Sequence, residues 1–376
     1  YLIESEMYTF FLSIEYCFLS IGDIIKIDGI ELKIRKIVIG KNKALYIEAV
    51  RYSKAIDRAS RSASKPEDIN SNFSAIIPDT RLEIMDIKLL PDEQQNIGRL
   101  LFAAVGLSEG WQGVTVFINI NGDRKFLCSI ENEGIIGTCV SNFSKPRYNN
   151  IIDRRSKVIV NLISGTLSSA TDEEFGSGKN LALIGNEIIQ FQKAKLIQKN
   201  QYELSHFIRG KFGSDISQEL EGQRFIMLDN SIHSVPISDL LIDSEIEFKY
   251  LSNGHSQEME SDYKINYQAN NLKPLSPVNI SFEMNGDLLH IKWTRRSRAA
   301  IPWRSGIDMP IYEEKEIYRV RLFYRGNLLI NVESEDRVIE IKISELNNLP
   351  DEIRIAQLSA LTGAGIEGVM NCDLVI

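Results

Sequence analysis

The sequence predicts a mainly β fold: several small barrel-like or sandwich-like modules, one short α-helical segment, and a two-sheet sandwich at the end of the chain. Two observations support this prediction. Apolar and polar residues alternate with a period of two through much of the chain, and glycine-containing turn signals separate the alternating segments at short intervals. At 376 residues the chain is too long for one ordinary core, so several domains are expected.

The composition narrows the class of protein. Hydrophobic residues make up 43% of the chain and charged residues 25%, which is typical of a sequence that buries cores. The net charge of -8 argues against general binding to nucleic acid or anionic membrane, because both need a basic surface. No apolar run reaches the roughly 18 residues of a membrane-spanning helix.

The cysteines are few and scattered. Their spacing fits neither a disulfide scaffold nor a CxxC zinc site, so we expect free, partly buried thiols. The four are Cys17, Cys128, Cys139 and Cys372. Cys128 and Cys139 flank a candidate hairpin, and a bridge between them is the alternative.

Residues 1–55 are expected to form a β-barrel-like module, incomplete at its start. Asp28-Gly29 predicts a hairpin turn, because both residue types tolerate positive φ. Residues 54–75 lose the apolar pattern and gain Ser, Asn and charge, which predicts a linker. The sequence begins with Tyr1 and has no secretory signal pattern, so we expect a piece of a larger polypeptide.

Residues 56–150 are expected to comprise this linker and an α+β module. Pro91, followed by two acidic residues, predicts a short helix running to Gly106. Asn121-Gly122 then predicts a hairpin between short strands. Residues 151–271 are expected to form an all-β module, because turn signals punctuate them regularly.

The last expected domain is residues 272–376, set apart by Pro274 and Pro277. It contains about seven alternating segments, with Trp293 in an early one, which predicts an immunoglobulin-like sandwich. No cysteine pair bridges the region, so a fibronectin type III variant is the better description.

The search for catalytic chemistry finds no constellation. There is no G-x-S-x-G nucleophile elbow, and His206, His233, His255 and His290 are isolated from one another. The run from Gly176 to Asn180 is similar to a phosphate loop but lacks its first glycine and its Ser/Thr metal ligand, which predicts a turn. Acidic residues that could serve glycoside hydrolysis are present, but they are adjacent in sequence, which is common in proteins and does not indicate a catalytic pair. These are Asp172, Glu173, Glu174, Glu313 and Glu314. We therefore expect no enzyme, no cofactor and no metal.

A basic and aromatic cluster stands out in this acidic chain as a candidate interaction patch. Its members are Trp293, Arg295, Arg296, Arg298, Trp303 and Arg304. It could bind nucleic acid, since arginine engages phosphate and aromatic rings stack on bases, or it could contact a glycan or a protein. Alternatively its arginines pair with the acids that follow, which needs no partner and is favoured. Those acids are Asp308, Glu313, Glu314 and Glu316.

Four segments keep their order along the chain and together point to one family. They are Leu19-Ser20-Ile21-Gly22-Asp23-Ile24-Ile25; Trp111-Gln112-Gly113 with the turn at Asn121-Gly122-Asp123; the stretch from Asn180 to Gly213, with Glu187, Phe191, Arg209, Gly210 and Gly213; and W-T-R-R-S-R at 293–298, followed by Asp308-Met309-Pro310-Ile311. They resemble the tail-tip host-specificity proteins of siphophages and, more closely, the large baseplate (hub) proteins of alphaproteobacterial gene transfer agents. Ile21 replaces the family's proline, Lys211 its second basic residue and Ser214 its threonine.

The resemblance implies the C-terminal part of a structural tail-tip or baseplate hub protein, involved in particle assembly and in host attachment or DNA delivery. It implies other tail proteins as partners, a homotrimer in the particle and a host-surface glycan or protein as receptor. The particle would be assembled in the bacterial cytoplasm, with this chain at its tail tip. The glycosidase-like barrel of some relatives would lie outside this sequence.

Two alternatives remain open at this stage. The last domain could bind a surface glycan, for which an exposed Trp293 or Trp303 would be the mark. The chain could also be part of a cell-wall-degrading enzyme, for which an acid pair in a cleft would be the mark.

Overall fold

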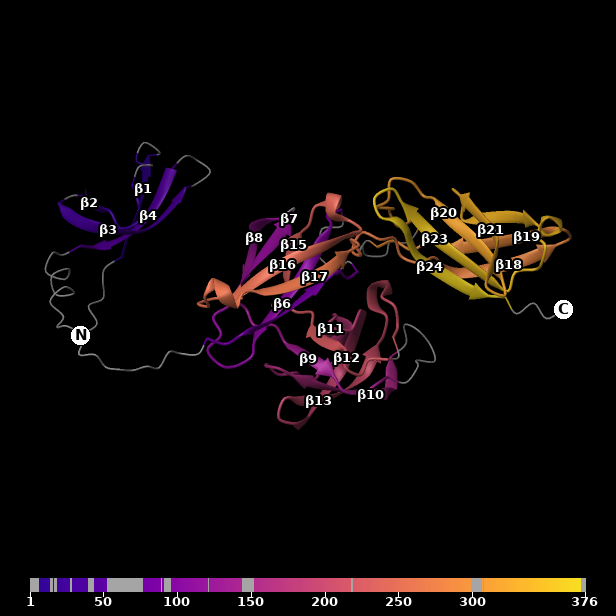
Figure 1. Ribbon diagram of the computed structural model, residues 1–376, viewed down its shortest axis with the longest axis horizontal. Coiled ribbons are helices and arrows are strands. Elements are labelled where there is room, and N and C mark those ends of the chain that lie inside the picture. The colour runs from indigo at the N-terminus through magenta and orange to yellow at the C-terminus, as the bar shows by residue number, and fades with distance from the viewer. Residues whose placement is uncertain are drawn as a thin grey trace. The chain divides into compact units, whose positions relative to one another are not determined.

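The computed structural model describes residues 7–13, 16, 19–27, 29–39, 44–52, 77–88, 90, 96–120, 122–143, 152–217, 219–298, 306 and 308–372. Figure 1 follows the chain by colour from its N-terminus to its C-terminus. Strands dominate throughout, so the predicted mainly β class is confirmed. The chain divides into two compact units, Tyr1–Ile76 and Ile77–Ile376, and each is described by itself.

The first unit contains a four-stranded antiparallel sheet. Its strands are β1 (Met7–Ser13), β2 (Ile24–Ile27), β3 (Ile30–Ile39) and β4 (Ala44–Arg51), in the order β1-β4-β3-β2. Among the residues described here the sheet does not close on itself, unlike the barrel-like module that was expected. A two-residue loop joins β2 to β3, and Gly29 has φ +83° as the predicted hairpin requires. Asp28 and the predicted linker at 54–75 lie outside the described residues.

The first domain of the second unit is a β-sandwich of two antiparallel sheets. One sheet contains β5 (Thr80–Met85), β6 (Arg99–Gly106) and β15 (His233–Pro236), in the order β15-β6-β5. The other contains β7 (Val114–Ile120), β8 (Asp123–Ile130), β16 (Ser244–Ser252) and β17 (Ser261–Tyr267), in the order β17-β16-β7-β8. Phe102 and Phe248 meet edge to face in the core between the sheets, with ring centroids 5.7 Å apart.

The predicted helix from Pro91 to Gly106 is wrong where the structure describes it, because Arg99–Gly106 is strand β6. Residues 91–95 lie outside the described residues. Every residue of β6 after Arg99 is buried: Leu100, Phe102 and Ala104 face the sandwich core, and the residues between them face a second core. A strand covered on both faces loses its polar alternation, so its apolar run cannot be told from a helix by periodicity.

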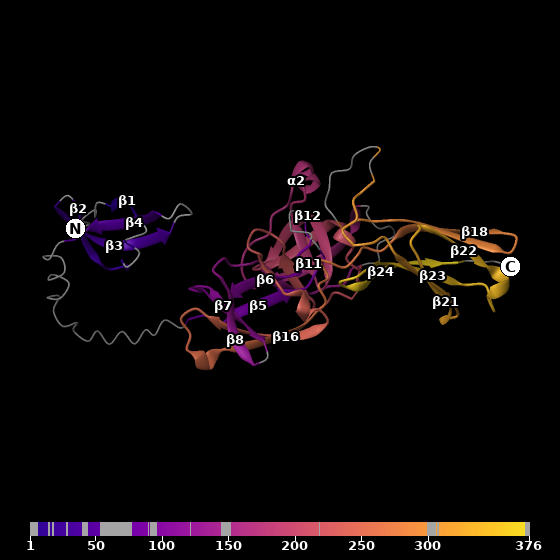
Figure 2. The same ribbon diagram turned by 90° about the horizontal axis from the view of Figure 1, so that it is seen from above.

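A closed six-stranded antiparallel barrel follows β8. It is formed by β9 (Ile136–Cys139), β10 (Asp153–Leu162), β11 (Leu181–Ile184), β12 (Glu187–Gln198), β13 (Gln201–Ile208) and β14 (Arg224–Met227). The hydrogen-bonded order is β10-β13-β12-β11-β14-β9, and β9 pairs with β10 to close the ring. The short helix α2 (Asp172–Gly176) lies beside β12, as Figure 2 shows.

The strand pairing does not follow the expected boundary between residues 150 and 151. Strand β9, before that boundary, belongs to the barrel, whereas β16, far beyond it, pairs with β7 of the sandwich. The barrel is therefore an insertion between β8 and β15. Turn and periodicity signals are local, so they cannot show that the chain returns to an earlier sheet.

A shared apolar core joins the barrel to the sandwich. Leu101, Ala103 and Val105 on the outer face of β6 pack with Leu183 and Ile226 on the outer faces of barrel strands. Burial of this kind stabilises by about 25 cal/mol per Å² of apolar surface removed from water. The barrel and the sandwich therefore share one packed interface rather than a loose tether.

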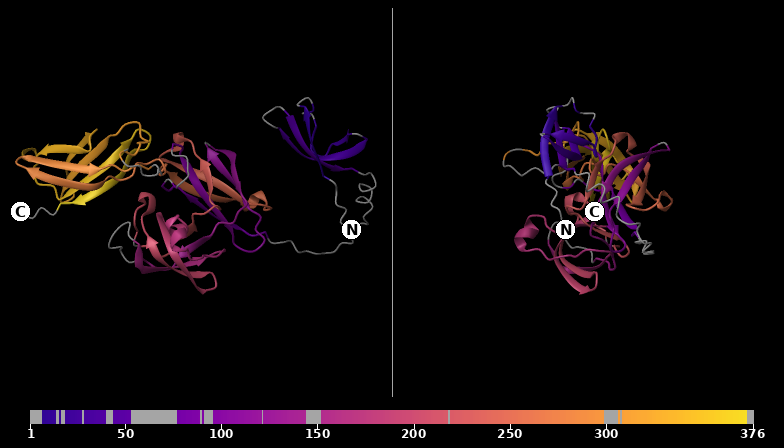
Figure 3. Two further views of the ribbon diagram at one scale, coloured as in Figure 1. Left: turned by 180° about the vertical axis from the view of Figure 1, so that it is seen from behind. Right: turned by 90° about the vertical axis from the view of Figure 1, so that its left-hand side faces the viewer.

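The last domain is a second sandwich. One sheet contains β18 (Val278–Asn285), β19 (Leu288–Thr294) and β22 (Val338–Lys342), in the order β18-β19-β22. The other contains β20 (Tyr318–Tyr324), β21 (Asn327–Ser334), β23 (Glu352–Ser359) and β24 (Gly363–Asn371), in the order β21-β20-β23-β24. The two layers can be followed in Figures 2 and 3. Seven strands divided three and four in this order give the fibronectin type III-like fold that was predicted.

Two further expectations have structural counterparts. Cys128, Cys139 and Cys372 are buried free thiols, so the alternative bridge between the first two is absent; Cys17 lies outside the described residues. Burial raises the pKa of the Cys128 thiol to about 11. Within the part of the chain that the structure describes, no helix combines the length and apolar character that spanning a membrane requires.

Candidate functional site

Trp293, the aromatic member of the predicted patch that the structure describes, lies in the core of the last sandwich. Its side chain is 5% exposed, and its ring meets that of Tyr318 edge to face, with centroids 5.1 Å apart. Strand β19 buries alternate residues, so Trp293 faces inward with Leu289 and Ile291. The ring is therefore unavailable for stacking on a ligand.

Two of the patch arginines pair with acids that follow them, as the ion-pairing interpretation expects. Arg295 lies 3.1 Å from Asp308 and 3.6 Å from Glu316, and Arg298 lies 3.0 Å from Glu313. Both arginine side chains are 7% exposed. Ion pairs from these two buried arginines thus tie the segment at 308–316, before β20, to the residues that follow β19, although Asp308 itself is 63% exposed.

Arg296 points elsewhere. Its guanidinium donates to the hydroxyl of Ser276 at 3.3 Å and approaches Gly213 of the barrel. Burial lowers the pKa of Arg296, and no acid contributes to the shift. Gly213 has φ +76°, and a Cβ there would lie 2.8 Å from Leu275 and 3.2 Å from Arg296. The glycine thus allows the barrel loop to approach both residues. Trp303 and Arg304 lie outside the described residues.

The barrel contains a fully buried ion pair between two residues of the third resembling segment. Arg209 donates to both carboxylate oxygens of Glu187, at 2.6 and 2.7 Å, and also to the carbonyl oxygen of Ser217 at 2.6 Å. The backbone N–H groups of Gly210 and Ser217 donate to the same carboxylate at 3.0 and 3.1 Å. The guanidinium also stacks 3.7 Å above the centroid of the Phe143 ring.

This pair fixes the loop that follows β13. Glu187 begins β12 and Arg209 follows β13, so the pair joins two strands and also captures Gly210 and Ser217 of the loop. Gly210 has φ +60°, and a Cβ there would lie 2.9 Å from Ile216. Phe191 is fully buried and pairs with Phe207 across the same strands. These residues of the third resembling segment therefore have a structural role in the barrel.

The first two resembling segments are also structural. Ser20 to Asp23 form a turn in which Gly22 has φ +100° and the N–H of Ser20 donates to the Asp23 carboxylate at 2.7 Å. A glycine at the third turn position with positive φ is the type II requirement, and proline favours the second position, which Ile21 occupies here. In the sandwich, the Trp111 indole donates to Thr80 at 2.7 Å. Gly113 has φ +106°, and a Cβ there would lie 2.7 Å from the carbonyl oxygen of Ile130.

The remaining candidate residues are dispersed. The four histidines lie on different elements, and the described residues contain no group of three His, Cys, Asp or Glu side chains placed to share a metal ion. Residues Gly176 to Asn180 follow the C-terminus of α2, whereas a phosphate loop precedes a helix. Glu174 closes a capping box with Thr171 and pairs with Lys179. These acids hold the fold locally rather than facing one another.

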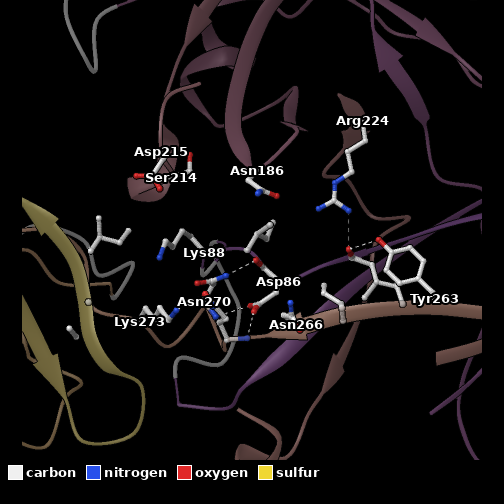
Figure 4. Close-up of a pocket in the computed structure, with 17 residues that line it drawn as sticks. Asp86, Lys88, Asn186, Ser214, Asp215, Arg224, Tyr263, Asn266, Asn270 and Lys273 are labelled. Carbon is white, nitrogen blue, oxygen red and sulfur yellow. Dashed lines mark hydrogen bonds between the residues drawn. The ribbon is translucent and has the colours of Figure 1, made fainter. Parts of the chain in front are cut away.

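A polar pocket of about 670 Å³ lies where sandwich, barrel and last domain meet. Sequence reasoning did not predict it. Its walls come from the end of β5 with the segment after it, the β11–β12 turn, the loop after β13, the start of β14, strand β17 with the segment after it, and the start of β24. Figure 4 shows Lys88 and Lys273 on the same side of this pocket, with Asp215 on one side of them and Asp86 and Asn270 on the other.

The two lysines of the pocket are unequally bonded. Lys273 donates to the side chain of Gln268 at 2.8 Å. Lys88 makes no hydrogen bond or ion pair with any described residue. Burial and, secondly, the charge of Lys273 lower the pKa of Lys88 to about 8, against the opposing attraction of Asp215 and Asp86. The pocket thus contains an ammonium group that is partly desolvated and unpaired within the described structure.

Asp86, one of the two acids that line the pocket, is bonded to the backbone. Its two carboxylate oxygens accept the N–H groups of Gln268 and Asn270, both at 2.7 Å, and its carbonyl oxygen accepts the Asn270 side chain at 3.1 Å. Burial raises the pKa of this carboxyl despite these bonds. Asp86 therefore anchors the segment after β17. Arg224 is also committed, since it donates to Gly185, Glu83 and Ile84.

The other polar side chains of the pocket are less engaged. The side-chain amides of Asn186 and Asn266 form no hydrogen bond with any residue that the structure describes. The walls between them include Ile87, Ile265 and Ile366. The one local signal that could have drawn attention here is the amide-rich run Gln268-Ala269-Asn270-Asn271 followed by Lys273.

Comparison with known proteins gives one family match. The family described as "Rcc01698-like, C-terminal" matches residues 134–226, which is the inserted barrel and about a quarter of the chain. The barrel is therefore similar to that family, and its Glu187–Arg209 pair lies inside the matched segment. No curated protein matches the sequence.

Among the solved structures that align with this chain, two cover most of it, but only at low TM-scores. The central fibronectin-III array of RIM-binding protein is 8% identical, with 79% of this chain and 98% of that chain covered and a TM-score of 0.19. The FN1–FN3 domains of chicken CNTN1 are 9% identical, with 78% and 97% covered and a TM-score of 0.20. Neither carries an argument about this protein.

Proposed function

We propose that this chain is a structural component of a phage-like tail tip or baseplate hub, involved in particle assembly and in host attachment or DNA delivery. The observation that carries the proposal is that three features occupy the same part of the chain. The matched family segment, the closed barrel and the buried Glu187–Arg209 network all fall between residues 134 and 227. The resembling segments outside the barrel also form turns, packing contacts or ion pairs, as a structural role requires.

The proposed partners are other tail and baseplate proteins, further copies of the chain in a homotrimer, and a host-surface glycan or protein. Support for assembly comes from the β12–β13 hairpin, whose outer part carries Leu196 and Ile197 at 58% and 47% exposure. These two neighbouring side chains offer apolar surface that a further chain could cover.

The proposal is non-enzymatic. Among the acids considered for glycoside hydrolysis, Glu174 closes a helix cap and Glu313 pairs with Arg298 and accepts from Gln357. Asp172 accepts from Gln192 at 2.5 Å. Glycan binding by the last domain has less support than assembly, because the buried Trp293 cannot stack on a sugar.

The test is localisation in particles purified from cells that carry the gene. We expect cryo-electron microscopy and an antibody against the chain to place it at the distal tail end. Arg209→Met, which breaks the buried pair, should deplete the chain from particles, whereas Lys157→Met, in an exposed pair of the same barrel, should leave it in place. Particles that lack the chain at the tail tip, with the wild-type protein present in the cells, would overturn the proposal.

A further inference from the structure

The pocket between sandwich, barrel and last domain has unused bonding capacity. Lys88 and Lys273 bring two positive charges to the same side of it. Like charges in a partly desolvated space repel, and the cost falls when an anion joins them. Asp86 gives both carboxylate oxygens to backbone N–H groups, and Asp215 is exposed at the rim. The ammonium of Lys88 therefore has room for an external partner.

The rest of the lining indicates what carries that anion. The amides of Asn186 and Asn266 each offer a donor and an acceptor, which suits hydroxyl groups. Ile265, Ile366 and Ile87 supply apolar wall between the polar groups. A volume of about 670 Å³ lies in the range of small-ligand sites. A flat apolar ligand would leave the amides and the ammonium unsatisfied.

We propose that this pocket binds an acidic sugar, with its carboxylate or phosphate group held by Lys88 and Lys273 and its hydroxyl groups held by Asn186 and Asn266. The site is distinct from the arginine cluster of the last sandwich. It does not rest on the proposed tail-tip role, because binding by the isolated chain tests it directly.

Lys88 is the group on which the anion depends most. Lys273 is already bonded to Gln268, and Arg224 to Gly185, Glu83 and Ile84, so their positions are fixed before a ligand enters. A bound anion would replace the hydration that Lys88 has lost on burial. Hydrogen bonds to charged groups are stronger than those between neutral groups, so loss of this one should be readily measured.

The experiment is isothermal calorimetry on the full chain with four probes: galacturonate, glucose 6-phosphate, glucose and inorganic phosphate. We expect at least one acidic sugar to bind at millimolar concentration or below, and whichever binds more tightly identifies a carboxylate or a phosphate source. Inorganic phosphate should bind more weakly than the preferred acidic sugar, and glucose should give no signal.

Variants locate the site. Lys88→Met and Lys273→Met should each weaken binding of the preferred sugar by about tenfold or more. Lys264→Met is the matched control, because Lys264 lies on β17 beside pocket residues but does not line the pocket and pairs with Glu245. It should bind as wild type does. Thermal unfolding of each variant shows whether it is folded.

A second measurement, the chemical reactivity of Lys88, detects binding without depending on the heat of binding. Lys88 should react with an amine-directed acylating reagent near neutral pH faster than Lys264, and the preferred sugar should protect it, as peptide mass spectrometry can quantify. Binding of glucose as tight as that of the acidic sugars would overturn the proposal. So would equal affinity in Lys88→Met and wild type, or no binding and no protection by any probe.

Discussion

Two charged clusters of the second unit differ in how completely the chain satisfies them. In the barrel, Glu187 and Arg209 are 0% and 2% exposed; two hydrogen bonds join them to each other, and three more connect them to Gly210 and Ser217. Among their buried side-chain atoms, only Nη1 of Arg209 has no hydrogen-bond partner in the described structure. In the pocket, Lys88 and Lys273 share a space in which Lys88 has no partner among the described residues. The first cluster is closed, and the second is open.

The difference separates structural charge from ligand-binding charge. A buried ion pair whose oxygens are all bonded has little to offer a ligand, and removal of one partner leaves the other as an uncompensated buried charge. A half-buried ammonium without a partner lowers the stability of the fold and gains from any anion that arrives. Loss of Arg209 should therefore lower the free energy of unfolding, whereas loss of Lys88 should raise it.

The largest expected effect comes from opening the closed cluster. Arg209→Met keeps much of the side-chain volume but leaves Glu187 charged and buried, so we expect the free energy of unfolding to fall by about 3–5 kcal/mol. Loss of the contact with the Phe143 ring adds to this. Urea unfolding followed by fluorescence would measure the change.

The control for this prediction is Lys157→Met. Lys157 pairs with Glu203 at 2.8 Å in the same barrel, but its side chain is 62% exposed. Exposed pairs contribute about 0–1 kcal/mol. If both variants lost the same stability, the burial argument would be wrong. The double variant with Glu187→Gln should lose less than the sum of the single variants, because they remove one shared interaction.

The open cluster should respond in the opposite direction. Lys88→Met removes a desolvated charge, so we expect the variant to be more stable than wild type at pH 7 by about 1–3 kcal/mol. The apolar side chain would lie near Ile87 and Ile366 of the pocket wall. Lys264→Met, in an exposed pair, should leave stability nearly unchanged.

The pH dependence follows from the lowered pKa of Lys88. Its folded value of about 8 lies below the ordinary 10.5, so between these values the unfolded chain binds more protons than the folded chain. The stability of the wild type should therefore rise with pH across that window, relative to Lys88→Met. Urea unfolding of both proteins at pH 7 and pH 10 would measure it. A constant difference between them would contradict the lowered pKa.

The sequence predicted the closed cluster better than the open one. Glu187, Arg209 and Gly210 were named from a family resemblance, and the structure brings them into direct contact. Alternating strands with Gly29 and Gly122 in their turns gave the mainly β class and two hairpins, although Asn121 lies outside the described residues. These features depend on local pattern or on residues that a motif already groups.

The pocket and the inserted barrel could not be read in the same way. Pocket residues come from six separate stretches between Ile84 and Ile366, and no spacing rule connects them. The return of β16 to β7 is likewise a pairing across more than a hundred residues. Strand β6 was mistaken for a helix because both its faces are covered, and the cover on one face is the barrel itself.

A smaller effect should come from the loop after β13, which runs from Arg209 of the closed cluster to the pocket residues of the open one. Gly213→Ala places a Cβ near Leu275 and Arg296 at positive φ, in the loop that precedes the pocket residues Ser214 and Asp215. We expect a loss of about 1–2 kcal/mol in the free energy of unfolding. Gly222→Ala is the matched control, because Gly222 has φ +79° but open space around it. A loss at Gly213 no larger than that at Gly222 would show that the close approach contributes nothing.

The smallest effect on stability should come from Asn266, an exposed pocket residue whose side-chain amide has no hydrogen-bond partner among the described residues. Asn266→Ala removes only unused bonding capacity, so the free energy of unfolding should stay within about 0.5 kcal/mol of wild type. Binding of the preferred acidic sugar should nevertheless weaken several-fold, measured by calorimetry under the same conditions. A variant that loses stability but keeps its affinity would reverse the assignment, because Asn266 would then belong with the closed cluster as a structural residue.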